Sequence, residues 1–127
     1  MNAADLMSKA RRALESARFL LSAADPDGAC NRAYYAMFDA ARAALPVSAA
    51  GVPAEVSKTQ GGLITAFSLH LVKTGRFPVE MGRSLNKVED LRLIADYKGD
   101  SLEQADAAWA VGQAVVFVET VAQVFEV

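Results

Sequence analysis

Arg32, Tyr35 and Asp39 are the first residues of the chain whose types and spacing could do chemistry. They lie three and four residues apart, so on a helix they share one face. An apolar set typical of a helix core falls on another face of the same segment: Tyr34, Met37, Phe38, Ala41 and Leu45. A polar row beside a core face is often only solvated or ion-paired, and that interpretation stays open beside a ligand-binding one.

The second candidate group is Arg92, Asp96 and Tyr97. Arg92 and Asp96 are spaced to form a helical ion pair, which alone contributes only about 0.3–0.5 kcal/mol and is common. A phenol such as that of Tyr97 is a weak acid–base group at neutral pH, because phenols titrate with a pKa of about 10 and imidazoles with one of about 6.5. The residues alone therefore make a weak case for acid–base catalysis.

The only histidine, His70, lies on the apolar stripe of its predicted helix with Leu63, Phe67 and Leu71. A lone histidine on such a face is more often a packed residue than a catalytic one. No carboxylate stands three or four residues from it, so we predict no metal site and no cofactor. The single cysteine, Cys30, excludes an intramolecular disulfide and suits a reducing cytoplasm.

The composition predicts one compact domain over residues 1–127. Of the 127 residues, 53% are hydrophobic, which is enough for one core. Thirteen Lys and Arg oppose fifteen Asp and Glu, so the net charge of −2 gives no global attraction for nucleic acid, and RNA binding would need a local basic patch. We expect a cytoplasmic protein that does not enter the membrane, because we see no secretory leader and no segment with the roughly 20 apolar residues of a membrane span.

Hydrophobic periodicity and cap signals predict an all-α, antiparallel up-and-down bundle of about five helices. The expected ranges are 3–24, from the Asp25–Gly28 break to about 45, from Ser57–Gln60 to about 74, 79–97, and from Ser101–Gln104 to 125. The starts at Ser57 and Ser101 have capping-box form, with a Gln three residues after the Ser. Residues 46–56 carry Pro and Gly among small side chains and are expected to form a loop long enough to move or to cover a site.

The last predicted helix is apolar almost all round from Trp109 to Phe125. A helix of this kind must be covered on every side, and a five-helix monomer leaves part of it uncovered. We therefore predict a two-fold homodimer.

Four stretches together resemble the HEPN domain family: Asn31–Ala36 (NRAYYA), Ser57–Thr59 (SKT), Lys73–Gly75 (KTG) and Leu91–Tyr97 (LRLIADY). The likeness runs from the first helix through the fifth. HEPN domains are small all-α proteins that in prokaryotes are typically encoded beside a minimal nucleotidyltransferase, and many are metal-independent ribonucleases or toxin components. The resemblance implies a homodimer, a nucleotidyltransferase partner, and RNA or nucleotide handling at the dimer cleft.

In the family, the helix end that resembles Leu91–Tyr97 carries an Arg-x4–6-His motif. Its Arg neutralises the scissile phosphate, and its His assists proton transfer during cleavage through the ribose 2′-hydroxyl. Here Arg92 matches the arginine, but Tyr97 stands where a His is expected, and no His follows. Relatives often carry a His at the position of Gln60 as well, so the nuclease motif is incomplete in this chain.

The resemblance leaves two functions open. The first is an RNA-binding or nucleotide-binding subunit of a minimal nucleotidyltransferase, in a toxin–antitoxin-like module. The second is a metal-independent, toxin-type endoribonuclease with its cleft at the dimer interface. The candidate catalytic residues are Arg92, Asp96 and Tyr97, and the candidate binding residues are Arg32, Tyr35, Asp39 and Gln60.

Overall fold

The computed structural model describes residues 2–47, 60–97 and 101–126, with the side chains at 46, 47, 60 and 97 left aside. These residues form helices and connecting turns, and no strand occurs among them. The elements in chain order are α1 (Ala3–Ser22), α2 (Pro26–Val47), α3 (Gln60–Phe67), η2 (Ser68–Val72), α4 (Val79–Tyr97) and α5 (Gln104–Phe125). The predicted all-α bundle is thereby confirmed.

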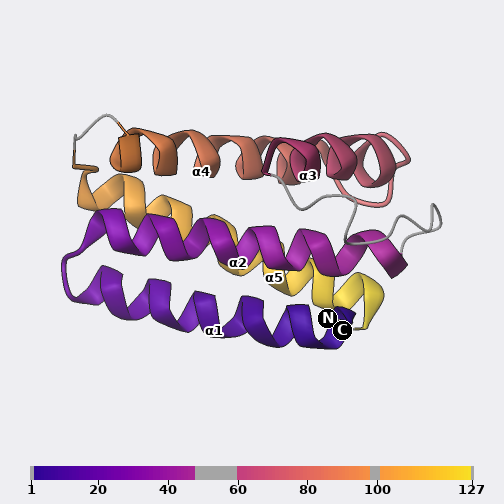
Figure 1. Ribbon diagram of the computed structural model, residues 1–127, viewed down its shortest axis with the longest axis horizontal. Helices are drawn as coiled ribbons and strands as arrows, with labels where there is room; N and C mark the ends of the chain where they lie inside the picture. Colours follow the sequence, from indigo (N-terminus) through magenta and orange to yellow (C-terminus); the bar gives the residue numbers. More distant parts are fainter. Residues whose placement is uncertain (1, 48–59, 98–100, 127) are drawn as a thin grey trace.

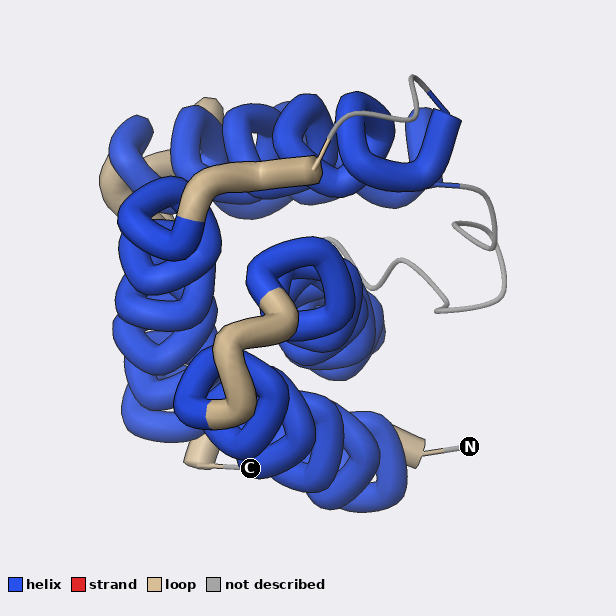
Figure 2. The backbone as a smooth tube through the Cα atoms, turned by 90° about the vertical axis from the view of Figure 1, so that its left-hand side faces the viewer, coloured by secondary structure: helices blue, strands red, loops and turns tan. Residues whose placement is uncertain are grey.

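Helix α2 is the central helix of the bundle and contacts α1, α3, α4 and α5. In Figure 1, α4 and α3 lie along one edge, α2 and α5 along the middle, and α1 along the opposite edge. The end-on view in Figure 2 shows α2 surrounded on three sides, by α1, by α5, and by the layer that contains α3 and α4. No described helix covers its fourth side.

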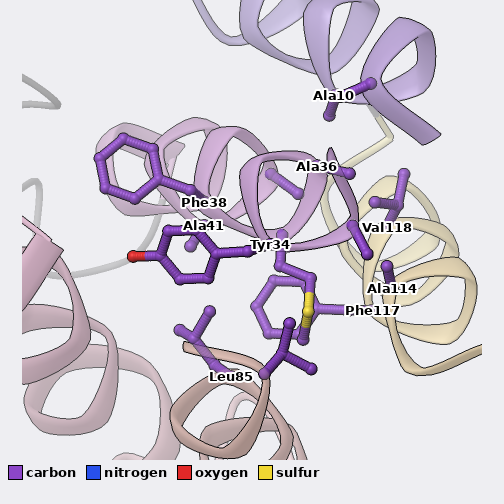
Figure 3. Close-up of a cluster of buried hydrophobic side chains, with 14 of the residues drawn as sticks. Ala10, Tyr34, Ala36, Phe38, Ala41, Leu85, Ala114, Phe117 and Val118 are labelled. Carbon is purple, nitrogen blue, oxygen red and sulfur yellow. The ribbon is translucent and has the colours of Figure 1, made fainter. Parts of the chain in front are cut away.

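Small side chains let the other helices approach α2 closely. Fully buried alanines recur along it: Ala29, Ala33, Ala36, Ala40, Ala41, Ala43 and Ala44. In Figure 3, Ala36 lies near Ala10 of α1 and near Ala114 and Val118 of α5. Three helices thus meet at small side chains, which allows dense packing without large ones.

Local hydrogen bonds set the ends of the first two helices. The Asn2 side chain accepts a bond of 2.8 Å from the Asp5 amide and caps α1. Asp25 does the same for α2, accepting a bond of 3.0 Å from the Gly28 amide, and Pro26 is the first helical residue. The predicted break at Asp25–Gly28 is therefore shorter than expected, because Asp27 and Gly28 already belong to α2.

The predicted capping box at Ser101 is wrong. The N-cap of α5 is Glu103, and α5 begins at Gln104. The backbone amide of Leu102 donates a bond of 2.8 Å to the Asp27 carboxylate of α2, and the Leu102 side chain is buried. This anchoring holds the chain at residue 102 in a non-helical conformation, so the helix starts two residues later than a Ser101 cap would give.

The third predicted helix is divided in a way that its sequence pattern did not predict. Its α-helical part ends at Phe67 and continues as a π-helix through Val72. Gly75 then adopts a φ of 82°, as expected for a glycine that ends a helix. The capping box at Ser57 and most of the predicted 46–56 loop lie outside the described residues, whereas residues 46 and 47 belong to α2.

One expectation about the last helix is also corrected. By length and composition, α5 is apolar enough to cross a membrane, and it is one such helix among the described residues. The core helix of a helical bundle meets the same criterion. In this fold α5 packs against α2 and α1 through a buried row: Ala107, Ala110, Val111, Ala114, Phe117, Val118 and Val121.

Candidate functional site

Arg92 is a buried arginine that joins α4 to α2. It continues the apolar row of Leu85 and Val88 on the face of α4 turned to α2, and only 3% of it is exposed. Its Nη1 donates a bond of 2.9 Å to the Asp96 carboxylate. Its guanidinium carbon lies 4.7 Å from the ring centroid of Tyr34, within cation–π range. The Arg92 guanidinium therefore contacts the carboxylate of Asp96 on its own helix and the ring of Tyr34 on α2.

Tyr34 holds the same junction from the side of α2. Its ring is fully buried, and Figure 3 shows it projecting from α2 toward Leu85. Its hydroxyl donates a bond of 3.1 Å to the Glu89 carboxylate of α4. Burial, and then the neighbouring Glu89 charge, raise the pKa of Tyr34 above its ordinary value, so the hydroxyl stays protonated and remains a donor.

Tyr35 lies between this buried junction and the side of α2 that no described helix covers. The guanidinium carbons of Arg92 and Arg32 each lie 5.8 Å from its ring centroid. Tyr35 and Arg32 are both half-buried, and the Asp96 side chain beside Arg92 is 33% exposed. We call Arg32, Tyr35 and Asp96 the α2–α4 cluster, which presents one cation, one phenol and one carboxylate at the surface above buried Arg92.

Asp39 is close to this cluster but is buried. Only 3% of Asp39 is exposed, and its carboxylate lies 3.8 Å from the Arg42 guanidinium. Burial raises the pKa of Asp39, while the cations Lys9, Arg42 and Arg32 oppose that rise. Burial leaves little of the Asp39 side chain for a ligand to contact, and its role in binding stays a prediction.

The structure brings together four of the predicted site residues, Arg32, Tyr35, Arg92 and Asp96. The side chains of Gln60 and Tyr97 lie outside the described part of the chain. Two participants were missed as site residues: Tyr34, which was predicted as core only, and Glu89. Glu89 stands three residues before Arg92 on α4, and that spacing was the available signal.

The other reactive side chains lie outside the α2–α4 cluster. His70 is half-buried on η2, which packs against α3 and α4. Burial raises the pKa of the Cys30 thiol to about 12, so it stays protonated and is a poor nucleophile. Within the described ranges, no three His, Cys, Asp or Glu side chains gather closely enough to hold a metal ion.

Residues 3–124 match the family model of the HEPN domain, which covers nearly the whole chain. The chain belongs to the HEPN family. The family resemblance of NRAYYA and LRLIADY is thus confirmed, and these two motifs are the segments that meet at the Arg92 junction of this HEPN protein.

Relatives of known name share this family over most of their length. A UPF0332 protein of Gloeobacter violaceus is 38% identical over 91% of this chain and 89% of its own. "Putative toxin MJ0605" of Methanocaldococcus jannaschii is 30% identical over 91% of this chain and 83% of its own. "Putative toxin MJ0142" of the same organism is 26% identical over 89% of this chain and 74% of its own.

Replacing Arg92 is expected to destabilise the fold. Arg92→Ala removes the cation–π contact and leaves a cavity between α4 and α2, so we expect a loss of about 2–4 kcal/mol in the free energy of unfolding. Arg92→Met, which retains an apolar side chain of similar length, should lose less. Urea unfolding followed by circular dichroism measures both. The matched control is Arg83→Ala, on the exposed side of α4, and equal losses in Arg83→Ala and Arg92→Ala would contradict a structural role for Arg92.

The buried Asp39 predicts a pH-dependent stability. Its folded-state pKa is raised above the ordinary value of 3.8, so the folded protein binds the proton more tightly than the unfolded chain. The favourable contribution is complete below the unfolded pKa and is lost as pH rises through the folded pKa. The stability of Asp39→Asn relative to wild type should therefore increase as pH rises above the ordinary pKa of 3.8, which urea unfolding of both proteins at a series of pH values measures. A difference that is constant with pH, or that has the opposite sign, would rule out this account of Asp39.

Proposed function

We propose that this HEPN protein binds RNA or a nucleotide at the α2–α4 cluster and serves as the partner subunit of a minimal nucleotidyltransferase in a toxin–antitoxin-like module. The proposal rests on the different exposure of two arginines. Arg92 is buried and paired with Asp96, whereas Arg32 remains half-buried at the surface beside Tyr35. Arg32 is thus the cation of the cluster that a phosphate can reach without rearrangement.

The chemistry of the cluster favours binding over cleavage. An arginine can donate bidentate bonds to a phosphate, and a tyrosine ring can stack with a base or donate from its hydroxyl. Metal-independent cleavage through a 2′-hydroxyl needs a group that can exchange a proton near neutral pH. The cluster contains no imidazole, because the only histidine of the chain is His70 on η2. The elevated pKa of Tyr34 removes that phenol as a base.

The alternative function is a metal-independent endoribonuclease with its cleft at a dimer interface. Its support is that two relatives carry names that describe them as toxins. In this alternative, Arg92 would have to leave its pairing with Asp96 to reach a scissile phosphate.

The proposed homodimer is supported by exposed apolar side chains on α5, where 42% of Trp109 and 57% of Val116 are accessible. Light scattering of the purified chain tests the homodimer. Co-purification with a co-expressed nucleotidyltransferase tests the complex with that partner.

The proposal predicts RNA binding without RNA cleavage. Purified protein should shift the anisotropy of a fluorescent single-stranded oligoribonucleotide, and the oligonucleotide should stay intact in the presence of EDTA. Arg32→Ala should weaken binding about tenfold and lower the salt slope of binding by about 1, because one phosphate contact is lost. Arg83→Ala, which removes an exposed arginine on another face, is the matched control.

Two outcomes would contradict the proposal. Absence of binding by wild-type protein at low salt would remove its basis. Cleavage that persists in EDTA and is lost in Arg92→Lys would establish the endoribonuclease instead. Arg92→Lys keeps the charge, so its loss of cleavage would report on the guanidinium and not on the fold, provided that its unfolding transition stays cooperative.

A further inference from the structure

Phe19 is an aromatic residue that the fold leaves outside the core. It is 71% exposed, the largest exposed fraction among the large apolar side chains of the described residues. It lies apart from the buried row of α1, which consists of Leu6, Met7, Ala10, Ala13, Leu14 and Ala17. Phe19 therefore contributes little to the stability of the bundle, and its ring is accessible to a ligand.

Phe19 forms one wall of a groove between α1 and α2. The groove has a volume of about 560 Å³ and is lined by Glu15, Ser16, Phe19, Leu20 and Arg32. The groove is shallow and largely open to solvent. Ligand sites combine apolar side chains with a few polar groups. This groove has that combination, with a phenyl ring, an aliphatic side chain, a guanidinium and a carboxylate.

Arg32 makes the groove continuous with the α2–α4 cluster. Arg32 lines the groove together with Phe19, and its guanidinium carbon lies 5.8 Å from the ring centroid of Tyr35. Arg32 thus contacts one aromatic ring, that of Tyr35, and shares the lining of the groove with a second, that of Phe19. Single-stranded nucleic acids are bound by this pattern, in which bases stack on aromatic side chains and phosphates contact cations.

Helix α1 extends the positive charge along the same side. Lys9, Arg12, Ser16 and Phe19 are spaced three and four residues apart and share one face of α1. Lys9 lies near enough to α2 to lower the pKa of Asp39. Arg12 is exposed and bonds only to Ser8 on its own helix, at 3.2 Å, among the contacts described. Lys9 and Arg12 thus place two cations on this face of α1, between Asp5 at its start and the groove that contains Glu15.

We infer that Phe19 is a stacking platform for one unpaired nucleobase of a single-stranded RNA, whose phosphates contact Arg32 and the Lys9–Arg12 side of α1. This inference rests on the proposed RNA-binding function and adds the strand class and the position of one base. A base inside a duplex has no free face to offer, so paired RNA should bind more weakly. Glu15 is the acid of the groove and opposes phosphates, so Glu15→Gln should strengthen binding.

A protein surface is a less suitable occupant of this groove. Phe19 and Leu20 are its apolar residues, and charged Glu15 and Arg32 lie directly beside them. Stable protein interfaces need a larger contact, of about 800 Å² per partner, around a desolvated apolar centre. The exposed Trp109 and Val116 of α5 answer that description better than the surroundings of Phe19 do.

The test measures binding of a fluorescent single-stranded oligoadenylate by anisotropy. Phe19→Ala should weaken binding about 5- to 100-fold, the usual effect of losing one stacked base, and Phe19→Trp should retain or improve it. Leu69→Ala, which removes another exposed apolar side chain on η2, should leave affinity unchanged. In a Trp109→Phe background, the tryptophan of Phe19→Trp is the only one, and its fluorescence should be quenched when the oligonucleotide binds.

The outcomes separate this inference from the proposed function. Binding by wild type that is lost in Arg32→Ala and unchanged in Phe19→Ala would overturn the stacking role and leave RNA binding at the cluster intact. Equal affinity for single-stranded and duplex RNA would also overturn it. A Phe19→Ala variant that changes mass in light scattering, or loses a co-expressed protein, with unchanged RNA affinity would assign Phe19 to a protein interface. Absence of binding by wild type itself would overturn the proposed function.

Discussion

The contact of the Arg92 guanidinium with the Tyr34 ring is the constraint on which the arrangement of the site depends. An arginine that is 97% buried is costly unless its charge is compensated, and here Asp96 and the face of Tyr34 compensate it at 2.9 and 4.7 Å. The hydroxyl of the same tyrosine bonds Glu89, so α4 is tied to α2 at two points. These ties fix the register of the two helices, and with it the positions of Tyr35 and Asp96 at the surface.

This use of Arg92 changes how the incomplete nuclease motif is understood. The arginine that the family resemblance assigns to the scissile phosphate is part of the packing between two helices in this chain, and the neighbouring histidine is absent. A cation that is accessible is instead Arg32 on α2, which contacts the Tyr35 ring and lines a groove together with Phe19. Recognition of a phosphate and catalysis of its cleavage need different groups, and the cluster supplies those of the first.

Periodicity and caps were enough to predict the bundle and most helix ends, because each helix buries one regular apolar face. Two local features could not be read from spacing, and the first of them depends on a contact between distant segments. Asp27 delays the start of α5 by bonding the Leu102 amide, and a π-helical segment follows Phe67. At the site, the burial of Arg92 had a signal, since it continues the row of Leu85 and Val88, but its charge suggested a surface position. The exposure of Phe19 was indicated by its place off the apolar stripe of α1, whereas its proximity to Arg32 required the packing of α1 on α2.

We propose that RNA is bound on the side of α2 that lies between α1 and α4. The most direct measurement is a titration of 15N-labelled protein with a short single-stranded oligoribonucleotide, followed by amide chemical shifts. We expect the largest amide shifts at Phe19, Arg32 and Tyr35, and we expect these shifts to become smaller at high salt. Shifts confined to the α4–α5 surface around Trp109, or no shifts at saturating oligonucleotide, would contradict it.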